Sequence, residues 1–254
     1  MKLKNPIVLI HGLGAKQSYG PIEYFYGLAP WLKKDDNEIY IANLKFWHSL
    51  ESRGEQLKEQ IEKEFPADKF GKLNLIGHSM GGLDARYLTS TLGFSDRVAS
   101  VTTIGTPNKG TSLADMVLGI IPQKAVVKVE TYLAALGWSN HGFHQMTKAY
   151  HDETFSVQAP DVPGVRYFSA TSAISEPVMK NALLPFWATY PILKKLEGDN
   201  DGFVSVESAM WGEHICTYQG DHYAQIGQLL GHSRGLDYMK FYEEIFGRLA
   251  QEGL

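Results

Sequence analysis

The chain has 254 residues, of which 44% are hydrophobic and 20% charged, a composition typical of a globular protein with a sizeable core. Its formal net charge of −4 excludes the basic excess that marks nucleic-acid-binding proteins, so we expect no nucleic acid partner. The single cysteine, Cys216, excludes an intrachain disulfide. The sequence contains no run of about 18 apolar residues, so it predicts no transmembrane span.

The first residues carry no pattern of an export signal. The apolar run Ile7–Ile10 is too short for the apolar region of a signal peptide, and a histidine and a glycine end it. We therefore expect either an intracellular protein or one whose export signal is missing or unconventional. The sequence leaves its location open.

Five short apolar segments predict buried strands. Each is apolar almost throughout, without clean alternation, which is typical of parallel strands covered on both faces. The five segments are Pro6–Ile10, Leu73–Gly77, Val98–Gly105, Val165–Thr171 and His214–Gly220.

Helical patterns separate the predicted strands. Leu57, Ile61 and Phe65 form one apolar stripe, and the spacing of Ser52 and Glu55 predicts a capping box where that helix begins. Another amphipathic pattern lies near the C-terminus. Strands that alternate with helices predict a single doubly wound α/β domain, with a mostly parallel sheet covered by helices on both faces.

One region interrupts this alternation. From about residue 112 to 156 the pattern is helical, with a break at Pro122 and no strong strand. We interpret the region as a helical insertion that lies over the sheet. Its histidines are His141, His144 and His151, which we expect at the surface or in local hydrogen bonds. We expect no metal site there, because no cysteine or carboxylate cluster accompanies them.

The segment Asn74–Tyr87 reads NLIGHSMGGLDARY and contains G-x-S-x-G after an apolar run and before a helical pattern. At a sharp strand-to-helix turn, side chains at Gly77 and Gly81 would collide, and the central serine is strained and exposed at the carboxyl edge of the sheet. We predict Ser79 as a nucleophile. The Met80 amide, at the N-terminus of the helix, is a predicted oxyanion donor.

A serine nucleophile needs a base to accept its proton and an acid to orient that base. In this type of fold the chain order is serine, carboxylate, histidine. His222 follows the last apolar strand and is the predicted base, with His232 as the alternative. Asp201 in the polar turn GDNDGFVS is the predicted acid, with Asp199 as the alternative.

A second oxyanion donor is expected directly after the first strand. The segment IVLIHGLG places Leu13 between two glycines, which allow the backbone to approach a ligand closely. We therefore predict the Leu13 amide as the partner of the elbow amide.

Segments along nearly the whole chain resemble the bacterial true lipases related to the Pseudomonas, Burkholderia and Proteus enzymes. The similar segments, in family order, are PIVLIHGLG, RGEQL, LNLIGHSMGG, TIGTPNKGTSLAD, NDGFVS and HYAQIGQLLG. The resemblance implies an α/β-hydrolase fold, hydrolysis of triacylglycerol esters and a mobile helical lid in the insertion. It matches Ser79, Asp201 and His222 to the family's triad. It also matches Leu13 and Met80 to its oxyanion donors.

The sequence departs from this family at a calcium site. Ala224 stands where many members have an aspartate ligand two residues after the catalytic histidine, and the segment Asn181–Trp187 has no carboxylate for the second ligand. Gln228 remains, but one amide oxygen cannot hold a dication that takes six or more oxygens. We therefore expect no calcium and no other cofactor. The family's paired cysteines are also absent, and its members are commonly secreted.

The substrate stays open among ester-like compounds. The apolar stripes of the insertion, together with the segment Asn181–Leu193, predict an acyl groove that meets an oil–water interface when a lid opens. This favours a lipase. The alternatives are a carboxylesterase for short soluble esters, a phospholipase or thioesterase with the same triad, and a non-catalytic lipid-binding protein. We expect a monomer whose partner is its lipid or ester substrate.

Overall fold

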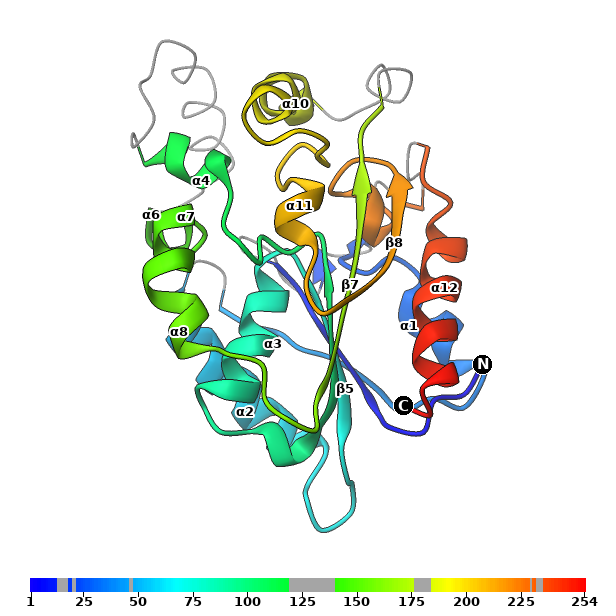
Figure 1. The fold of residues 1–254 in the computed structure, drawn as a ribbon. Coiled ribbons are helices and arrows are strands. Elements are labelled where there is room, and N and C mark those ends of the chain that lie inside the picture. Colours follow the sequence, from blue (N-terminus) through cyan, green and yellow to red (C-terminus); the bar gives the residue numbers. More distant parts are fainter. Residues whose placement is uncertain are drawn as a thin grey trace.

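The computed structural model describes residues 1–12, 18–19, 22–45, 48–118, 140–175, 184–228, 230–231 and 235–254. Its centre is a six-stranded sheet in the order β4-β1-β5-β6-β7-β8, in which every neighbouring pair is parallel (Figure 1). The strands are β1 (Ile7–Ile10), β4 (Ile39–Ile41), β5 (Leu73–His78), β6 (Val98–Ile104), β7 (Arg166–Ala173) and β8 (Glu213–Gln219). A separate antiparallel pair joins β2 (Ser18–Tyr19) to β3 (Ile22–Glu23).

The parallel sheet confirms the predicted fold class, and all five predicted strands are present within two residues of their expected bounds. The sixth strand, β4, was not expected. It has only three residues, all of them half-buried, at the edge of the sheet. Its three residues are fewer than the about four to eight that mark a strand in a sequence, so the short apolar run at this point is a weak strand signal.

Helices cover both faces of the sheet (Figure 1). On one side lie α2 (Leu50–Glu64) and α3 (Met80–Ser90), and on the other α1 (Leu28–Lys33) and α12 (Tyr238–Gln251). Successive residues of β1 point to opposite faces, so Leu9 joins the core under α12 while Val8 joins the core under α2. Both cores are apolar, which is why the strands read as continuous apolar runs.

The start of α2 differs from the sequence prediction. Ser49 is its N-cap, and the Ser49 hydroxyl accepts a hydrogen bond from the Ser52 amide at 3.5 Å. The predicted capping box at Ser52 and Glu55 is therefore wrong by one turn, because both residues already lie inside the helix. The predicted stripe of α2 is buried: Leu57 and Ile61 are fully covered.

The described parts of the insertion are helical: the first lies towards the carboxyl ends of the strands, and the others run down beside α3 (Figure 1). They are α4 (Ser112–Val117), α6 (Asn140–His144), α7 (Lys148–Tyr150), a π-helical turn (His151–Phe155) and α8 (Ser156–Gln158). Phe143 and Phe155 belong to the same buried apolar cluster as Met80 and Leu83 of α3. Residues 119–139, the middle of the insertion, lie outside the described residues.

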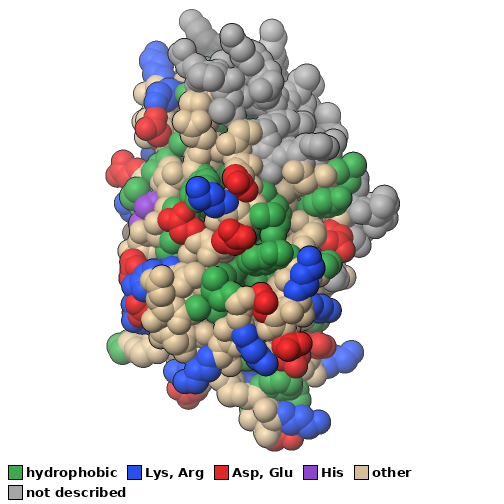
Figure 2. All heavy atoms as spheres, turned by 90° about the vertical axis from the view of Figure 1, so that its right-hand side faces the viewer, with side chains coloured by type: hydrophobic (Ala, Val, Ile, Leu, Met, Phe, Trp, Pro, Cys, Tyr) green, Lys and Arg blue, Asp and Glu red, His purple; other side chains and the backbone are tan. Residues whose placement is uncertain are grey.

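The remaining helices come between β7 and β8 in the sequence, or are short turns next to the ends of other strands. They are α10 (Leu184–Glu197), α11 (Val206–Ala209), and the 3₁₀ turns at Ser95–Arg97 and Ala224–Ile226. None of the helices in the described ranges is long and apolar enough to cross a membrane. On the face that contains α12, acidic and basic side chains are interspersed among apolar ones (Figure 2), so this face offers no continuous basic surface for nucleic acid.

His151 corrects one expectation about the insertion. It was expected at the surface or in local hydrogen bonds, but it is fully buried. Its ring nitrogens face the main chain of Asn108 and Gln145 without forming a hydrogen bond of normal geometry. Burial, followed by the positive charge of Arg86, lowers the pKa of His151 to about 4. His144 is exposed, as expected, and the side chain of His141 lies outside the described residues.

We expect acid to destabilise the fold through His151. With a folded pKa of about 4 against an ordinary value of 6.5, the imidazole binds fewer protons in the folded chain than in the unfolded one. Its contribution to stability is therefore complete above about pH 6.5. It is lost as the pH falls towards 4, by up to about 1.4 kcal/mol per pH unit.

Urea unfolding between pH 7 and pH 4.5 measures this dependence. The His151→Phe variant should show a shallower fall of the unfolding free energy with decreasing pH than the wild type. The exposed His144 supplies the matched control, because His144→Phe should leave the slope unchanged. Equal slopes in the His151→Phe variant and the wild type would contradict the burial argument.

Candidate active site

Ser79 lies on a strained turn between β5 and α3. Its backbone has φ 56° and ψ −132°, a region that costs a non-glycine residue about 1–3 kcal/mol. A Cβ on Gly77 would lie 2.3 Å from the main chain of Gly81, and a Cβ on Gly81 would lie 2.3 Å from the Ile10 carbonyl oxygen. Both glycines are thus required sterically. Ser79 is half-buried, whereas the side chains on either side of it are fully buried.

The loops after α10 and β8 bring Asp201 and His222 together. The Oδ2 atom of Asp201 lies 2.7 Å from Nδ1 of His222, and both side chains are almost fully buried. The His222 main-chain N–H also donates to the Asp201 carbonyl oxygen at 2.9 Å. The alternative acid, Asp199, is exposed and pairs with Lys194. The structure therefore places Asp201, and not Asp199, against the histidine.

The Asp201 carboxylate accepts three further hydrogen bonds that hold it in one orientation. Its Oδ1 atom accepts from the main-chain N–H groups of Phe203 at 2.9 Å and Val204 at 2.8 Å. Its Oδ2 atom accepts from Nε2 of Gln225 at 2.8 Å. Gln225, fully buried in the 3₁₀ turn after His222, was missed in the sequence analysis. No sequence signal marks it, because its burial and its contact with Asp201 arise only in the fold.

The His222 loop lies against the elbow. The ring centroids of His222 and His78, which directly precedes Ser79, are 4.5 Å apart at an interplanar angle of 44°. No hydrogen bond joins the Ser79 hydroxyl to the His222 ring in the described part of the chain. Such bonds are often long in unliganded enzymes and shorten when substrate binds.

Two segments of main chain approach Ser79, one from α3 and one from the loop after β1. Met80 is the first residue of α3, where helix N–H groups have no intrahelical partner. After β1, a Cβ on Gly12 would lie 2.9 Å from Cβ of Ser79, so this backbone passes directly beside the predicted nucleophile. Leu13, the other predicted donor, and His232, the alternative base, lie outside the described residues.

A buried ion pair supports the backbone that leads to Leu13. The guanidinium of Arg53 donates to Asp84 at 2.6 Å and to the His11 carbonyl oxygen at 2.7 Å, and both charged side chains are fully buried. The His11 ring accepts the Leu44 N–H at 3.0 Å and contacts the Gly12 carbonyl oxygen at 2.9 Å. Burial, followed by the charge of Arg53, lowers the pKa of His11 to about 3, so its ring is neutral.

The residues around the expected calcium position do not fit that ion. The Ala224 methyl group is buried, and Nε2 of Gln228 donates to the carbonyl oxygens of Glu23 at 2.5 Å and Tyr24 at 3.2 Å. Nowhere in the described ranges do three or more His, Cys, Asp or Glu side chains cluster as metal ligands would. The absence of calcium stays a prediction, because residues 176–183 of this region lie outside those ranges.

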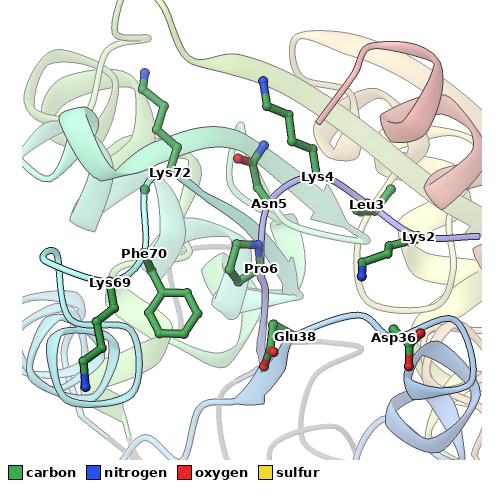
Figure 3. Close-up of a pocket in the computed structure, with 11 residues that line it drawn as sticks. Lys2, Leu3, Lys4, Asn5, Pro6, Asp36, Glu38, Lys69, Phe70 and Lys72 are labelled. Atoms are coloured by element: carbon green, nitrogen blue, oxygen red, sulfur yellow. The ribbon is translucent and has the colours of Figure 1, made fainter.

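A cleft of about 310 Å³ at the opposite edge of the sheet is separate from this site (Figure 3). It lies at the amino ends of β1 and β5, whereas Ser79 follows the carboxyl end of β5. Figure 3 shows that the ammonium groups of Lys4 and Lys72 point one way and that of Lys69 the other. These lysines therefore do not converge on a single anion.

A parallel sheet with a strained serine after β5, and an aspartate–histidine pair supplied by later loops, defines an α/β-hydrolase. A family model described as alpha/beta hydrolase fold matches residues 5–125. A triacylglycerol lipase of Vibrio cholerae is 33% identical, covering 98% of this chain and 88% of that protein. The chain belongs to the lipase family of α/β-hydrolases, which are serine ester hydrolases.

Two other lipases are similar to this chain, one in sequence and one in structure. Triacylglycerol lipase 2 of Saccharomyces cerevisiae is 29% identical over 91% of this chain and 74% of its own length. The crystal structure of a mature Bacillus licheniformis lipase superposes with a TM-score of 0.74 and 19% identity, covering 97% of this chain and 92% of that one. At that identity the superposition shows the shared fold.

Proposed function

We propose that this protein hydrolyses the carboxylic esters of lipids, with triacylglycerols as its substrate class and Ser79, His222 and Asp201 as its catalytic triad. The observation that carries the proposal is the buried Asp201–His222 contact of 2.7 Å beside a serine held at φ 56°. Strain of this kind marks a functional position, because a structural serine would relax to an ordinary conformation. The names of the two lipase relatives support the substrate class.

In the first half of the proposed reaction, the acyl group moves to the enzyme. His222 accepts the hydroxyl proton of Ser79 as the serine oxygen bonds to the ester carbonyl carbon. Asp201 accepts the Nδ1–H of His222, which holds the tautomer and stabilises the imidazolium. The amides of Leu13 and Met80 donate to the oxyanion. His222 then gives its proton to the leaving alkoxide oxygen as the carbon–oxygen bond breaks, which releases the alcohol.

In the second half, water replaces the alcohol. His222 takes a proton from the water as its oxygen attacks the acyl carbonyl carbon, and the same amides hold the second oxyanion. When that intermediate collapses, His222 returns the proton to the Ser79 oxygen and the fatty acid leaves. One ester and one water thus give one alcohol and one acid, with the enzyme unchanged.

In this proposal the protein is a monomer, residues 1–254 form one hydrolase domain, and the insertion at about residues 112–156 is its lid. The buried apolar cluster that Phe143 and Phe155 share with Met80, next to Ser79 in the chain, supports this role. If the lid moves, the apolar surface that it covers becomes available to a lipid interface.

Covalent labelling tests the nucleophile. A phosphonate ester should modify Ser79 alone, as mapped by peptide mass spectrometry. A chain-length series of nitrophenyl and glycerol esters then tests the substrate class. Activity should extend to long chains and rise above the solubility limit of the ester. An adduct on another residue contradicts the assigned nucleophile. A preference for short soluble esters, without a gain at the interface, favours a carboxylesterase.

A further inference from the structure

The ring of His78 is fully buried between the two segments that carry the proposed base and the proposed oxyanion donor. Its Nδ1 atom lies 2.7 Å from the Tyr24 hydroxyl, and its Nε2 atom lies 3.1 Å from the His222 carbonyl oxygen. The Tyr24 oxygen in turn accepts the Gly12 main-chain N–H at 3.0 Å. A continuous chain of hydrogen bonds therefore runs from the main chain of His222 to the main chain of Gly12.

One end of this hydrogen-bond chain is a carbonyl oxygen and the other is a main-chain N–H, and these two groups set the direction of every bond between them. The His222 carbonyl oxygen can only accept, so the His78 proton is on Nε2. Nδ1 of the neutral ring then accepts the Tyr24 O–H. Burial, followed by the positive charge that His222 carries when protonated, keeps the pKa of His78 well below its usual range. The ring therefore keeps this tautomer while His222 gains and loses its proton.

The two ends of the hydrogen-bond chain lie on segments that carry proposed catalytic groups. His222 is the proposed base, and Gly12 directly precedes Leu13. A Cβ on Gly12 would lie 2.9 Å from the Tyr24 oxygen and 3.3 Å from Ser79 Oγ, so the tyrosine and the nucleophile flank the same glycine. The hydrogen-bond chain thus joins two segments that lie near Ser79, the loop of His222 and the backbone at Gly12.

A second buried histidine in the same region, His11, offers a contrast. The His11 ring contacts the carbonyl oxygen of the next residue, Gly12, and the amide of Leu44, and neither of its bonds reaches the His222 loop. The partners of His78 lie 54 and 144 positions away, on two separate segments of the site. Bonds that join distant segments set their relative position.

We propose that His78 is a positioning residue for ester hydrolysis, which acts through Tyr24 to hold the base loop in register with the backbone that leads to the oxyanion donor. This role rests on the proposed function. His78 neither touches substrate nor transfers a proton. Its effect comes from geometry, because a misplacement of about 1 Å between catalytic groups can cost about 100-fold in rate.

Removing the ring should lower kcat far more than it changes KM. We expect the His78→Leu variant to lose about 100-fold in kcat for a nitrophenyl ester, with KM within about threefold of wild type. The His78→Gln variant should recover about tenfold of that loss, because its side-chain amide can donate near the Nε2 position. Rates are referred to the concentration of folded sites, counted by phosphonate titration, so a loss of stability alone leaves kcat unchanged.

Tyr24→Phe removes the hydroxyl that bonds His78 and the Gly12 N–H, and it should lower kcat by about tenfold. Tyr40→Phe is its matched control, since the Tyr40 hydroxyl donates to Gln60 on α2, away from the site, and kcat should be unaffected. Combining Tyr24→Phe with His78→Leu should give no further loss beyond His78→Leu alone, because both changes break the same chain. Additive losses, or a His78→Leu variant with the kcat of wild type, would overturn the positioning role.

Nitrogen-15 spectra of histidine-labelled protein test the geometry without using activity. His78 should appear as a neutral Nε2–H tautomer across the neutral pH range, and Tyr24→Phe should shift its Nδ1 resonance. An Nδ1–H tautomer would overturn the proposal even in an active enzyme. A wild type that neither turns over esters nor labels at Ser79 would instead sink the proposed function, and the spectra would still decide the hydrogen-bond chain.

Discussion

The Ser79→Ala variant is expected to lose hydrolysis of a nitrophenyl ester by about 10⁴- to 10⁶-fold while it remains folded. Without the hydroxyl, no acyl-enzyme forms, and only the oxyanion donors and substrate binding are left to accelerate attack by water. The stability should change little, because the half-buried hydroxyl has no hydrogen bond within the described residues and alanine meets the same strain at φ 56°.

Two matched variants sharpen this result. Ser90→Ala, at the other end of α3, should keep the wild-type rate. Ser79→Gly should be as inactive as Ser79→Ala but more stable by about 1 kcal/mol, because glycine occupies a positive φ without strain. Turnover and urea unfolding measure both quantities. A Ser79→Ala protein with more than about one hundredth of wild-type kcat would refute the assignment.

Asp84→Ala is expected to lower the free energy of unfolding by about 3–5 kcal/mol, the largest stability effect that we expect of a single substitution. It leaves the Arg53 guanidinium fully buried without a counter-ion. Arg53 also holds the carbonyl oxygen of His11, next to Gly12, so the backbone beside Ser79 should loosen and the specific activity should fall as well. Urea unfolding and ester hydrolysis on the same samples measure the two effects.

A double variant separates the cost of an unpaired charge from the contribution of the ion pair. Arg53→Met combined with Asp84→Leu replaces both charges by apolar side chains of similar size, and it should be more stable than Asp84→Ala alone. It should not recover full activity, because the bond to the His11 carbonyl oxygen is lost. An Asp84→Ala variant within 1 kcal/mol of wild type would show that solvent reaches Arg53, contrary to its burial.

Features with local physical causes were predictable from the sequence. The five long strands were recognised because burial on both faces demands continuous apolar side chains, and the elbow because its steric conflicts involve neighbouring segments. A side chain at Gly77 would collide with main chain only four residues away, so G-x-S-x-G after an apolar run already implies the turn. The collision of a side chain at Gly81 with Ile10 on β1 appears only in the folded chain. The start of α2 was missed by a turn because Ser49 and Ser52 are both acceptable caps.

Features that depend on contacts between distant segments needed the tertiary structure. Asp199 and Asp201 lie in the same polar turn, and only the fold directs one to solvent and the other to His222. Gln225 and the Tyr24–His78 pair gave no pattern, because their partners are far away along the chain.

The sequence by itself thus determined the class of the fold and the position of the strained strand-to-helix turn, and it predicted the order of the proposed triad, since these follow from the hydrophobic pattern, from steric limits at the turn and from the chain order of this fold. Only the tertiary structure decided which carboxylate meets His222, which buried histidines stay neutral, and how Ser79 is surrounded. The physical reason is that a buried polar group must find its partner in three dimensions, and hydrogen-bond partners across the interior leave no periodic trace along the chain.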